Sequence, residues 1–138
     1  MDPNNPVVRL CTEGMLAESE GRQSDARRLF LEAWNARVDD YDGCVAAHYL
    51  ARHQDSAAEI LAWNLTAWRC AQAVPDGRAG AFQPSLLLNL GHSYETLGDE
   101  SQARRCFEEA KARIGDVPAG DYLEMLADGV ARALSRIR

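Results

Sequence analysis

The sequence predicts an all-α fold of three helical hairpins in a right-handed array, closed by a C-terminal capping helix. Two observations predict this fold. First, a segment that begins at residue 8 and a segment that begins at residue 85 share residues at a fixed offset of 77 positions. Second, apolar residues in these segments recur three and four positions apart, which is the spacing of one helix face. Similarity at a fixed offset indicates an internal repeat, in which each repeat is one supersecondary unit.

Two glycine pairs are the most informative members of the repeat. Gly91 lies 77 positions after Gly14, and Gly98 lies 77 positions after Gly21. Glycine within a helix costs about 1 kcal/mol relative to alanine, so Gly14 and Gly91 need a structural reason. The other matched pairs are Leu10 and Leu87, Glu18 and Glu95, Ser24 and Ser101, Ala26 and Ala103, Arg27 and Arg104, Arg28 and Arg105, Phe30 and Phe107, Glu32 and Glu109, and Ala33 and Ala110.

Each unit is predicted to form two helices joined by a tight turn. Gly98 can adopt the positive φ that ends the first helix, and Asp99 or Ser101 can cap the second. One face of the first helix carries Leu87, Leu90 and Tyr94, and the inner face of the second carries Ala103, Phe107 and Ala110.

The glycine inside the first helix is explained by the packing of the two helices. We interpret Gly91 and Ala103 as the small residues at the crossing point, where two backbones approach closely. Phe107 is expected to fill the space one turn further on. Packing between the two helices then offsets the cost of the glycine.

The arrangement resembles the tetratricopeptide repeat family, whose units have about 34 residues. The third unit fits the family pattern at Leu87, Leu90, Gly91, Tyr94, Gly98, Ala103, Phe107 and Ala110. The first unit fits at Leu10, Gly14, Gly21, Ala26, Phe30 and Ala33, and departs from the pattern at Glu13 and Ala17. The resemblance implies a single domain over residues 1–138, with repeats over about 7–38, 41–74 and 84–115.

The middle unit is predicted from the offset, because two units of about 34 residues leave a remainder of about nine. Segments 42–54 and 56–74 are expected to form its two helices. The family positions are assigned to Ala46, Tyr49 and Ala58, with His53 at the turn, while a shift of one residue would select Ala47 or Ala57.

The remaining segments are predicted to be a loop and a helix. Residues 75–84 begin and end with proline and contain two glycines, so a loop is expected there. Residues 120–138 carry apolar residues three or four positions apart, and Asp121 can cap a helix that begins there. We interpret this segment as the terminal element that covers the last repeat.

Composition argues against several classes of partner and location. The net charge is −6 and the pI is near 5.0, which argues against a nucleic-acid partner and mildly favours a basic or neutral one. No apolar run is long enough to span a bilayer, and the N-terminal residues lack the basic and apolar regions of a secretory leader. We therefore expect a cytoplasmic protein with no membrane partner.

Residues with reactive or metal-binding side chains form no recognised motif. The sequence has no G-x-S-x-G, H-E-x-x-H or P-loop motif, so neither catalysis nor a cofactor is predicted. Cys44 and His48 lie four positions apart, but His53 falls at the turn and a zinc site needs three or four ligands, so no metal is predicted. The four cysteines are expected to be reduced thiols, because no two are close in sequence.

The resemblance implies a function as well as a fold. In the family the first helices line a concave groove, so we expect a non-catalytic scaffold that binds a peptide or protein segment there. Glu18 and Glu95 occupy equivalent positions and are expected to attract a basic residue of the partner. The expected groove residues are Cys11, Met15, Glu18, Ser19, Cys44, His48, Arg52, Leu88, Asn89, His92, Glu95 and Thr96.

Two alternatives stay open at this level. His48 is either a groove residue or a half-buried polar residue of the core. The protein is either a partner-binding scaffold or a self-assembling module that forms a homodimer, because a short array leaves an apolar end face. A carboxylate clamp, which one family subgroup uses for a C-terminal carboxylate, is not expected, because Cys11, Ser85 and Asn89 stand where its basic residues would be.

Overall fold

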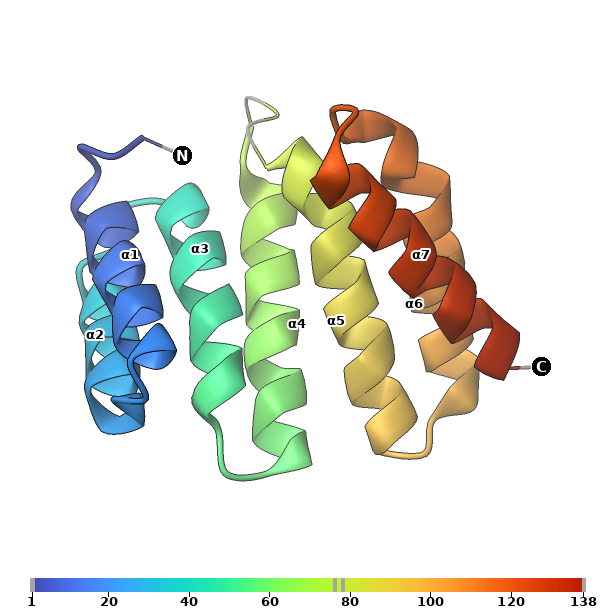
Figure 1. Ribbon diagram of the computed structural model, residues 1–138, viewed down its shortest axis with the longest axis horizontal. Coiled ribbons are helices and arrows are strands. Elements are labelled where there is room, and N and C mark those ends of the chain that lie inside the picture. The colour runs from blue at the N-terminus through green and yellow to red at the C-terminus, as the bar shows by residue number, and fades with distance from the viewer. Residues whose placement is uncertain (1, 76, 78, 138) are drawn as a thin grey trace. The chain divides into compact units, whose positions relative to one another are not determined.

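The computed structural model describes residues 2–75, 77 and 79–137, and within these ranges it is helical with no strand (Figure 1). The prediction of an all-α fold is confirmed. The α-helices are α1 (Pro6–Ser19), α2 (Gln23–Asn35), α3 (Asp40–Leu50), α4 (Ala57–Ala73), α5 (Gln83–Thr96), α6 (Glu100–Arg113) and α7 (Asp121–Arg136). Short 3₁₀ helices are η1 (Ala51–His53), η2 (Gly80–Phe82) and η3 (Ile114–Asp116).

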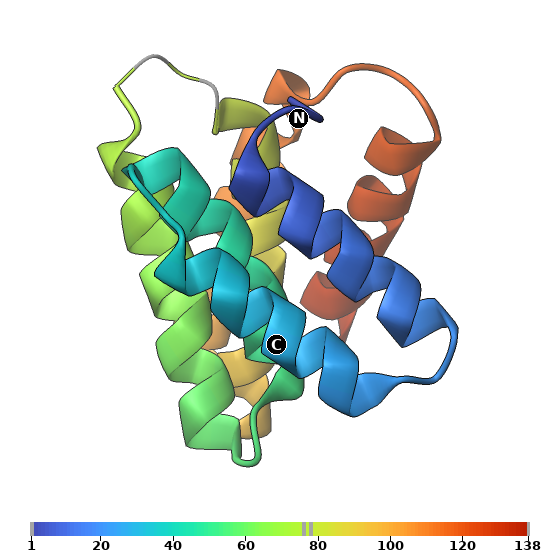
Figure 2. The ribbon, with the colours of Figure 1, turned by 90° about the vertical axis from the view of Figure 1, so that its left-hand side faces the viewer.

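The contacts divide the chain into two compact units, Met1–Ala73 and Val74–Arg138. In the first unit, α1 packs on α2, α3 packs on α4, and both helices of the first hairpin contact α3. Figure 2 shows α1 and α2 running side by side in opposite directions. In the second unit, α5 packs on α6, and α7 contacts both. The prediction of a single domain of stacked repeats stays a prediction.

The segment predicted as a loop is partly helical. Within residues 75–84, one turn of 3₁₀ helix (η2) precedes α5, which begins at Gln83 with Pro84 in its first turn. Proline is tolerated there, because the first backbone N–H groups of a helix have no intrahelical partner. Positions 76 and 78 lie outside the described residues, as does Arg138 at the end of the predicted capping segment.

The turns within the first and third hairpins follow the prediction. Gly21 has a φ of 78° and Gly98 a φ of 83°, a left-handed conformation that glycine adopts without strain. Asp99, rather than Ser101, caps α6, because its Oδ1 accepts a hydrogen bond from the backbone N–H of Gln102 at 3.2 Å. At the equivalent place in the first hairpin, Arg22 provides no side-chain cap to α2.

The glycines inside α1 and α5 make room for aromatic rings. A Cβ atom at Gly91 would lie 2.6 Å from Cδ1 of Phe107, and one at Gly14 would lie 2.7 Å from Cδ1 of Phe30. Both rings are fully buried. The expectation that Phe107 fills the space one turn further on is therefore corrected, because its ring lies directly against Gly91.

The helix starts give the middle hairpin a different register from the one assigned on sequence. α3 begins 34 positions after α1, and α4 begins 34 positions after α2. With this offset, His48 takes the place of Gly14 and Asn64 takes the place of Phe30. At the positions that the sequence analysis assigned to Ala46, Tyr49 and Ala58, or to Ala47 and Ala57 after a shift of one residue, the offset of 34 places His48, Ala51 and Ile60.

A buried carboxylate joins the starts of α1 and α3. The side chain of Asp42 is almost fully buried; its Oδ1 accepts a hydrogen bond from Nδ2 of Asn5 at 2.8 Å. Its Oδ2 accepts one from the backbone N–H of Val38 at 3.1 Å. Asn5 is also the N-cap of α1, so Asp42 fixes the first hairpin against α3. A bilayer crossing would need a longer and more apolar helix than any found in the described parts of the chain.

Candidate functional site

Two of the predicted groove residues lie in the core. Cys11 and Cys44 are buried, and burial raises the pKa of each thiol to about 12. The prediction that these side chains line a groove is therefore wrong.

Other predicted groove residues keep part of their surface accessible. Ser19 and Thr96 are exposed near the ends of α1 and α5, and each hydroxyl donates a hydrogen bond to a backbone carbonyl of its own helix. Met15 and Asn89 are half-buried. Leu88 is half-buried in the second unit, where it packs on the cluster of Ala103, Phe107, Ala133 and Ile137.

In the first unit, Glu18 is held by two basic side chains from the next hairpin. Its Oε1 accepts a hydrogen bond from Nη1 of Arg52 at 2.9 Å, and its Oε2 lies 2.7 Å from Nε2 of His53. The side chain of Glu18 is 19% exposed, whereas that of Arg52 is 47% exposed. The carboxylate therefore lies beneath the guanidinium, with both of its oxygens occupied.

Aromatic side chains support this ion pair. The ring of Tyr49 is stacked on that of Phe30, with centroids 5.2 Å apart. The guanidinium carbon of Arg52 lies 4.8 Å from the centroid of the Tyr49 ring, and the His48 ring meets the same tyrosine at 4.9 Å. Tyr49 thus connects the buried Phe30 to the polar groups at the surface. We call Glu18, His48 and Arg52 the first cluster.

The second unit contains a cluster of the same composition. Glu95 on α5 accepts two hydrogen bonds from Arg136 on α7, at 3.0 Å from Nη2 to Oε1 and at 3.3 Å from Nε to Oε2. The side chain of Glu95 is 29% exposed and that of Arg136 is 50% exposed. His92 lies one turn before Glu95, and its ring meets that of Phe107 with centroids 5.4 Å apart. We call Glu95, His92 and Arg136 the second cluster.

The pKa of the histidine is shifted in the same direction in both clusters. Burial lowers the pKa of His48 to about 4, nearby Arg52 lowers it further, and Glu18 opposes this change. Burial likewise lowers the pKa of His92. Nearby Arg136 lowers this pKa further, and Glu95 opposes the change. Each histidine is therefore neutral at pH 7. The hydrogen bonds from Arg136 hold the pKa of Glu95 below its ordinary value.

Sequence reasoning missed one member of these clusters and two residues that contact the first. It did not count Arg136 among the groove residues, placed His53 at a turn, and assigned Tyr49 only to a position of the repeat pattern. With the offset of 34, Arg52 is the equivalent of Glu18, so opposite charges at equivalent positions of adjacent repeats would have signalled the first ion pair. Arg136 comes from α7, which lies outside the repeat pattern and gave no such signal.

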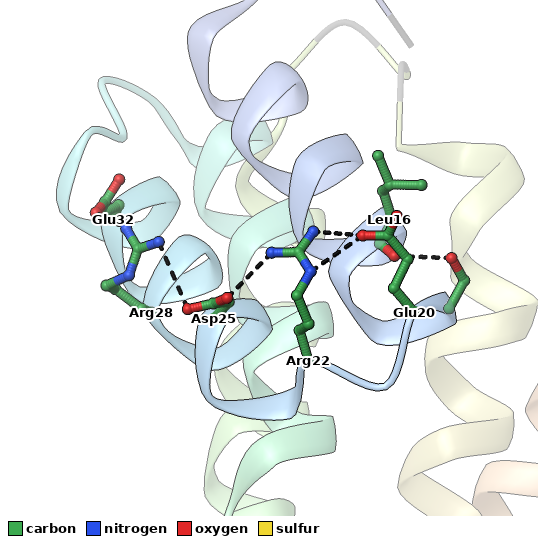
Figure 3. Close-up of polar contacts among 7 residues, drawn as sticks. Leu16, Glu20, Arg22, Asp25, Arg28 and Glu32 are labelled. Carbon is green, nitrogen blue, oxygen red and sulfur yellow. Dashed lines mark hydrogen bonds and ion pairs between the residues drawn. The ribbon is translucent and has the colours of Figure 1, made fainter.

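The second helix of the first hairpin carries a different charged network. Figure 3 shows it running from Glu20 through Arg22 and Asp25 to Arg28 and Glu32. Arg22 lies 3.0 Å from Asp25, and Arg28 lies 2.8 Å from Glu32. About half of each of these side chains is exposed, and exposed pairs of this kind contribute only about 0–1 kcal/mol. The network is a surface feature of α2, on the opposite helix of the hairpin from Glu18.

The described residues contain no group of three histidine, cysteine or acidic side chains that could hold a metal ion. The chain matched no protein-family model, no curated protein and no solved structure in the three comparisons. The resemblance to the tetratricopeptide repeat family therefore stays a prediction from the sequence.

Proposed function

We propose that the protein is a non-catalytic scaffold that binds a peptide or protein segment on the accessible side of its first helices. In each unit we call this side, together with the arginine beside it, the first-helix face. It consists of Met15, Ser19 and Arg52 in the first unit, and of Asn89, His92, Thr96 and Arg136 in the second. The observation that carries the proposal is the recurrence of the glutamate, arginine and histidine cluster on this face in each unit. Arrays of helical hairpins commonly use such faces for binding.

The face offers the mixture of groups that peptide recognition uses. In the first unit, Met15 gives apolar contact and Ser19 a hydroxyl, beside the guanidinium of Arg52. In the second, His92 and Thr96 give polar groups beside Asn89. Interfaces with peptides combine apolar anchors with a few placed hydrogen-bonding groups, and this surface fits that description. Neither a metal nor a cofactor is part of the proposal.

Self-assembly is the second candidate function. Tyr122 and Met125 lie three positions apart on α7 and are 44% and 61% exposed. Residues with this spacing share a helix face, so they form an apolar patch that a second copy of the chain could cover. Sedimentation velocity tests this alternative. A dimer at micromolar concentration that dissociates in the Met125→Lys variant would favour it.

Partner binding is tested with two matched double variants. Ser19→Arg with Thr96→Arg places bulk and charge on the first-helix face of both units. Ser24→Arg with Ser101→Arg does the same on the second helices at positions that are equivalent by the offset of 77. All four serine and threonine side chains are exposed, so we expect all variants to fold.

The measurement is quantitative mass spectrometry of proteins retained from a cell lysate by the immobilised wild type and the two variants. We expect a set of proteins that the wild type and the second-helix variant retain and the first-helix variant loses. Loss of that set in the second-helix variant alone, or no retention above bare resin, would contradict the proposed function.

A further inference from the structure

We propose that the first-helix face recognises an acidic side chain of its partner, and that one arginine within a unit binds the carboxylate, Arg52 in the first unit or Arg136 in the second. The inference rests on the proposed function and specifies the partner chemistry of the same face. It reverses the sequence-based expectation, in which Glu18 and Glu95 attract a basic residue.

Each carboxylate oxygen already has a partner within the protein. Glu18 uses Oε1 for Arg52 and Oε2 for His53. Glu95 uses both oxygens for Arg136. A basic residue of a partner would have only the second lone pair of an oxygen whose charge an internal arginine already balances. Both carboxylates are also less exposed than their arginine partners.

The second step is that both arginines retain donors. A guanidinium has five N–H groups in a planar fork. Arg52 donates to Glu18 only through Nη1, and Arg136 donates to Glu95 through Nε and Nη2. Among the described residues, no other protein acceptor lies within hydrogen-bonding distance of either guanidinium, and about half of each side chain is exposed. Nε and Nη2 of Arg52 and Nη1 of Arg136 therefore have no acceptor within the described part of the protein.

The third step is that Arg52 is held in place before a partner arrives. Its guanidinium carbon lies 4.8 Å from the centroid of the Tyr49 ring, a contact that uses none of its N–H groups and does not depend on Glu18. Holding a side chain in its bound conformation reduces the entropy lost on binding. A guanidinium is also the cation best suited to a carboxylate, since two parallel N–H groups match its two oxygens. The geometry is therefore that of a prepared carboxylate receptor.

The charge of the whole protein limits the kind of acidic segment that fits. With a net charge of −6, the chain repels a strongly acidic partner at long range. The first cluster attracts a carboxylate only locally, because Glu18 balances Arg52. The preferred partner is thus a segment with one or two acidic residues among neutral and apolar ones.

The probe is a phage-displayed library of random 12-residue peptides, selected on the immobilised wild-type protein. In this format the peptide has no free C-terminal carboxylate. We expect enriched sequences to carry an aspartate or glutamate and not to be enriched in lysine or arginine. One enriched peptide is then synthesised with an amidated C-terminus, together with a copy in which its acidic residue is replaced by the corresponding amide.

Calorimetry with these peptides distinguishes the acidic partner from a basic one. The amide copy should bind wild-type protein at least tenfold more weakly, and this comparison needs no protein variant. For a peptide at the first cluster, Arg52→Gln should weaken binding of the acidic peptide and leave binding of the amide copy unchanged. Glu18→Gln should tighten binding several-fold, because it frees Arg52 from its internal partner. For a peptide that binds at the second cluster, Arg136→Gln and Glu95→Gln are the corresponding variants, with the same expected results.

The matched control is Arg105→Gln, which removes an exposed arginine from a second helix and should leave the affinity unchanged. Enrichment of peptides without acidic residues would overturn the inference while leaving the proposed function intact. Weaker binding in both Glu18→Gln and Glu95→Gln would also overturn the inference, since it would show that the carboxylates themselves contact the partner. A failure to enrich any peptide would contradict the proposed function and the inference together.

Discussion

The ring of Phe107 occupies the space that a side chain at position 91 would need. A Cβ atom there would approach three carbons of the ring within 2.8 Å. The same relationship holds between Gly14 and Phe30 in the first hairpin. A contact that recurs in two hairpins at one offset is a packing rule of this fold, and it explains why glycine is retained inside two helices.

The first prediction is that Gly91→Leu destabilises the fold by about 1–3 kcal/mol or more, because overpacking in a filled core costs that much. The measurement is the free energy of unfolding in urea. Gly115→Leu is the control, since no atom lies within 4 Å of a Cβ built at that glycine. Equal stability of the Gly91→Leu variant and the wild type would disprove the packing rule.

The second prediction concerns His48, the residue that replaces this glycine in the middle hairpin. Its pKa is about 4 in the folded chain against an ordinary value of 6.5, so between these values the unfolded chain binds a proton that the folded chain does not. The contribution of His48 is fully present above pH 6.5 and is lost as the pH falls towards 4, by about 3 kcal/mol. Urea unfolding between pH 7 and 4.5 should show this slope in the wild type.

The control for His48 is the His48→Gln variant, which removes the titrating group and keeps a neutral polar side chain. Its stability should fall less steeply over the same pH range. Because His92 and the carboxylates titrate in both proteins, the difference between the two curves isolates His48. Identical slopes would show that His48 is not buried as a neutral group.

The third prediction concerns Asp42, whose carboxylate joins α1 to α3. Replacement by alanine removes the acceptor for Nδ2 of Asn5 and for the N–H of Val38. Both hydrogen bonds are partly buried, and leaving such donors without a partner costs about 1 kcal/mol, which should appear as a lower free energy of unfolding. Asp40→Ala, an exposed neighbour on the same helix, should change stability much less. If both variants were equally stable, Asp42 would have no structural role.

The fourth prediction concerns the buried thiols. Burial raises the pKa of Cys11 and Cys44 to about 12, so at pH 8 the thiolate fraction of each is about a thousandfold lower than in the unfolded chain. These two thiols should react with a disulfide reagent only on the timescale of unfolding, while all four react at once in guanidinium. Rapid reaction of Cys11 or Cys44 in native protein, identified by mass spectrometry, would contradict the burial described above.

The fold was predictable to the extent that the repeat pattern survives in the sequence. Gly14 and Phe30 repeat as Gly91 and Phe107, and Gly21 repeats as Gly98, so the outer hairpins and their turns could be located. The middle hairpin could not be aligned, because His48 and Asn64 stand where the glycine and the phenylalanine would be. Its register followed only from the starts of α3 and α4.

The candidate site was predictable only in part, because membership of a helix face does not determine exposure. Cys11 was assigned to the groove because the family resemblance places first helices there, yet its side chain is fully buried. The charge of the face depended on tertiary contacts that no local pattern contains. Arg136 lies 41 positions after Glu95, and only the packing of α7 on α5 brings them together.

The central claim is that partners bind the first helices of the hairpins, which are α1, α3 and α5. The most direct measurement is the change in backbone amide NMR shifts when a selected peptide is added to labelled protein. We predict that the largest changes map to α1, to α3 with η1, and to α5, around Ser19, Arg52 and Thr96. Changes confined to α2, α4 and α6, around Arg28 and Arg105, would contradict the claim.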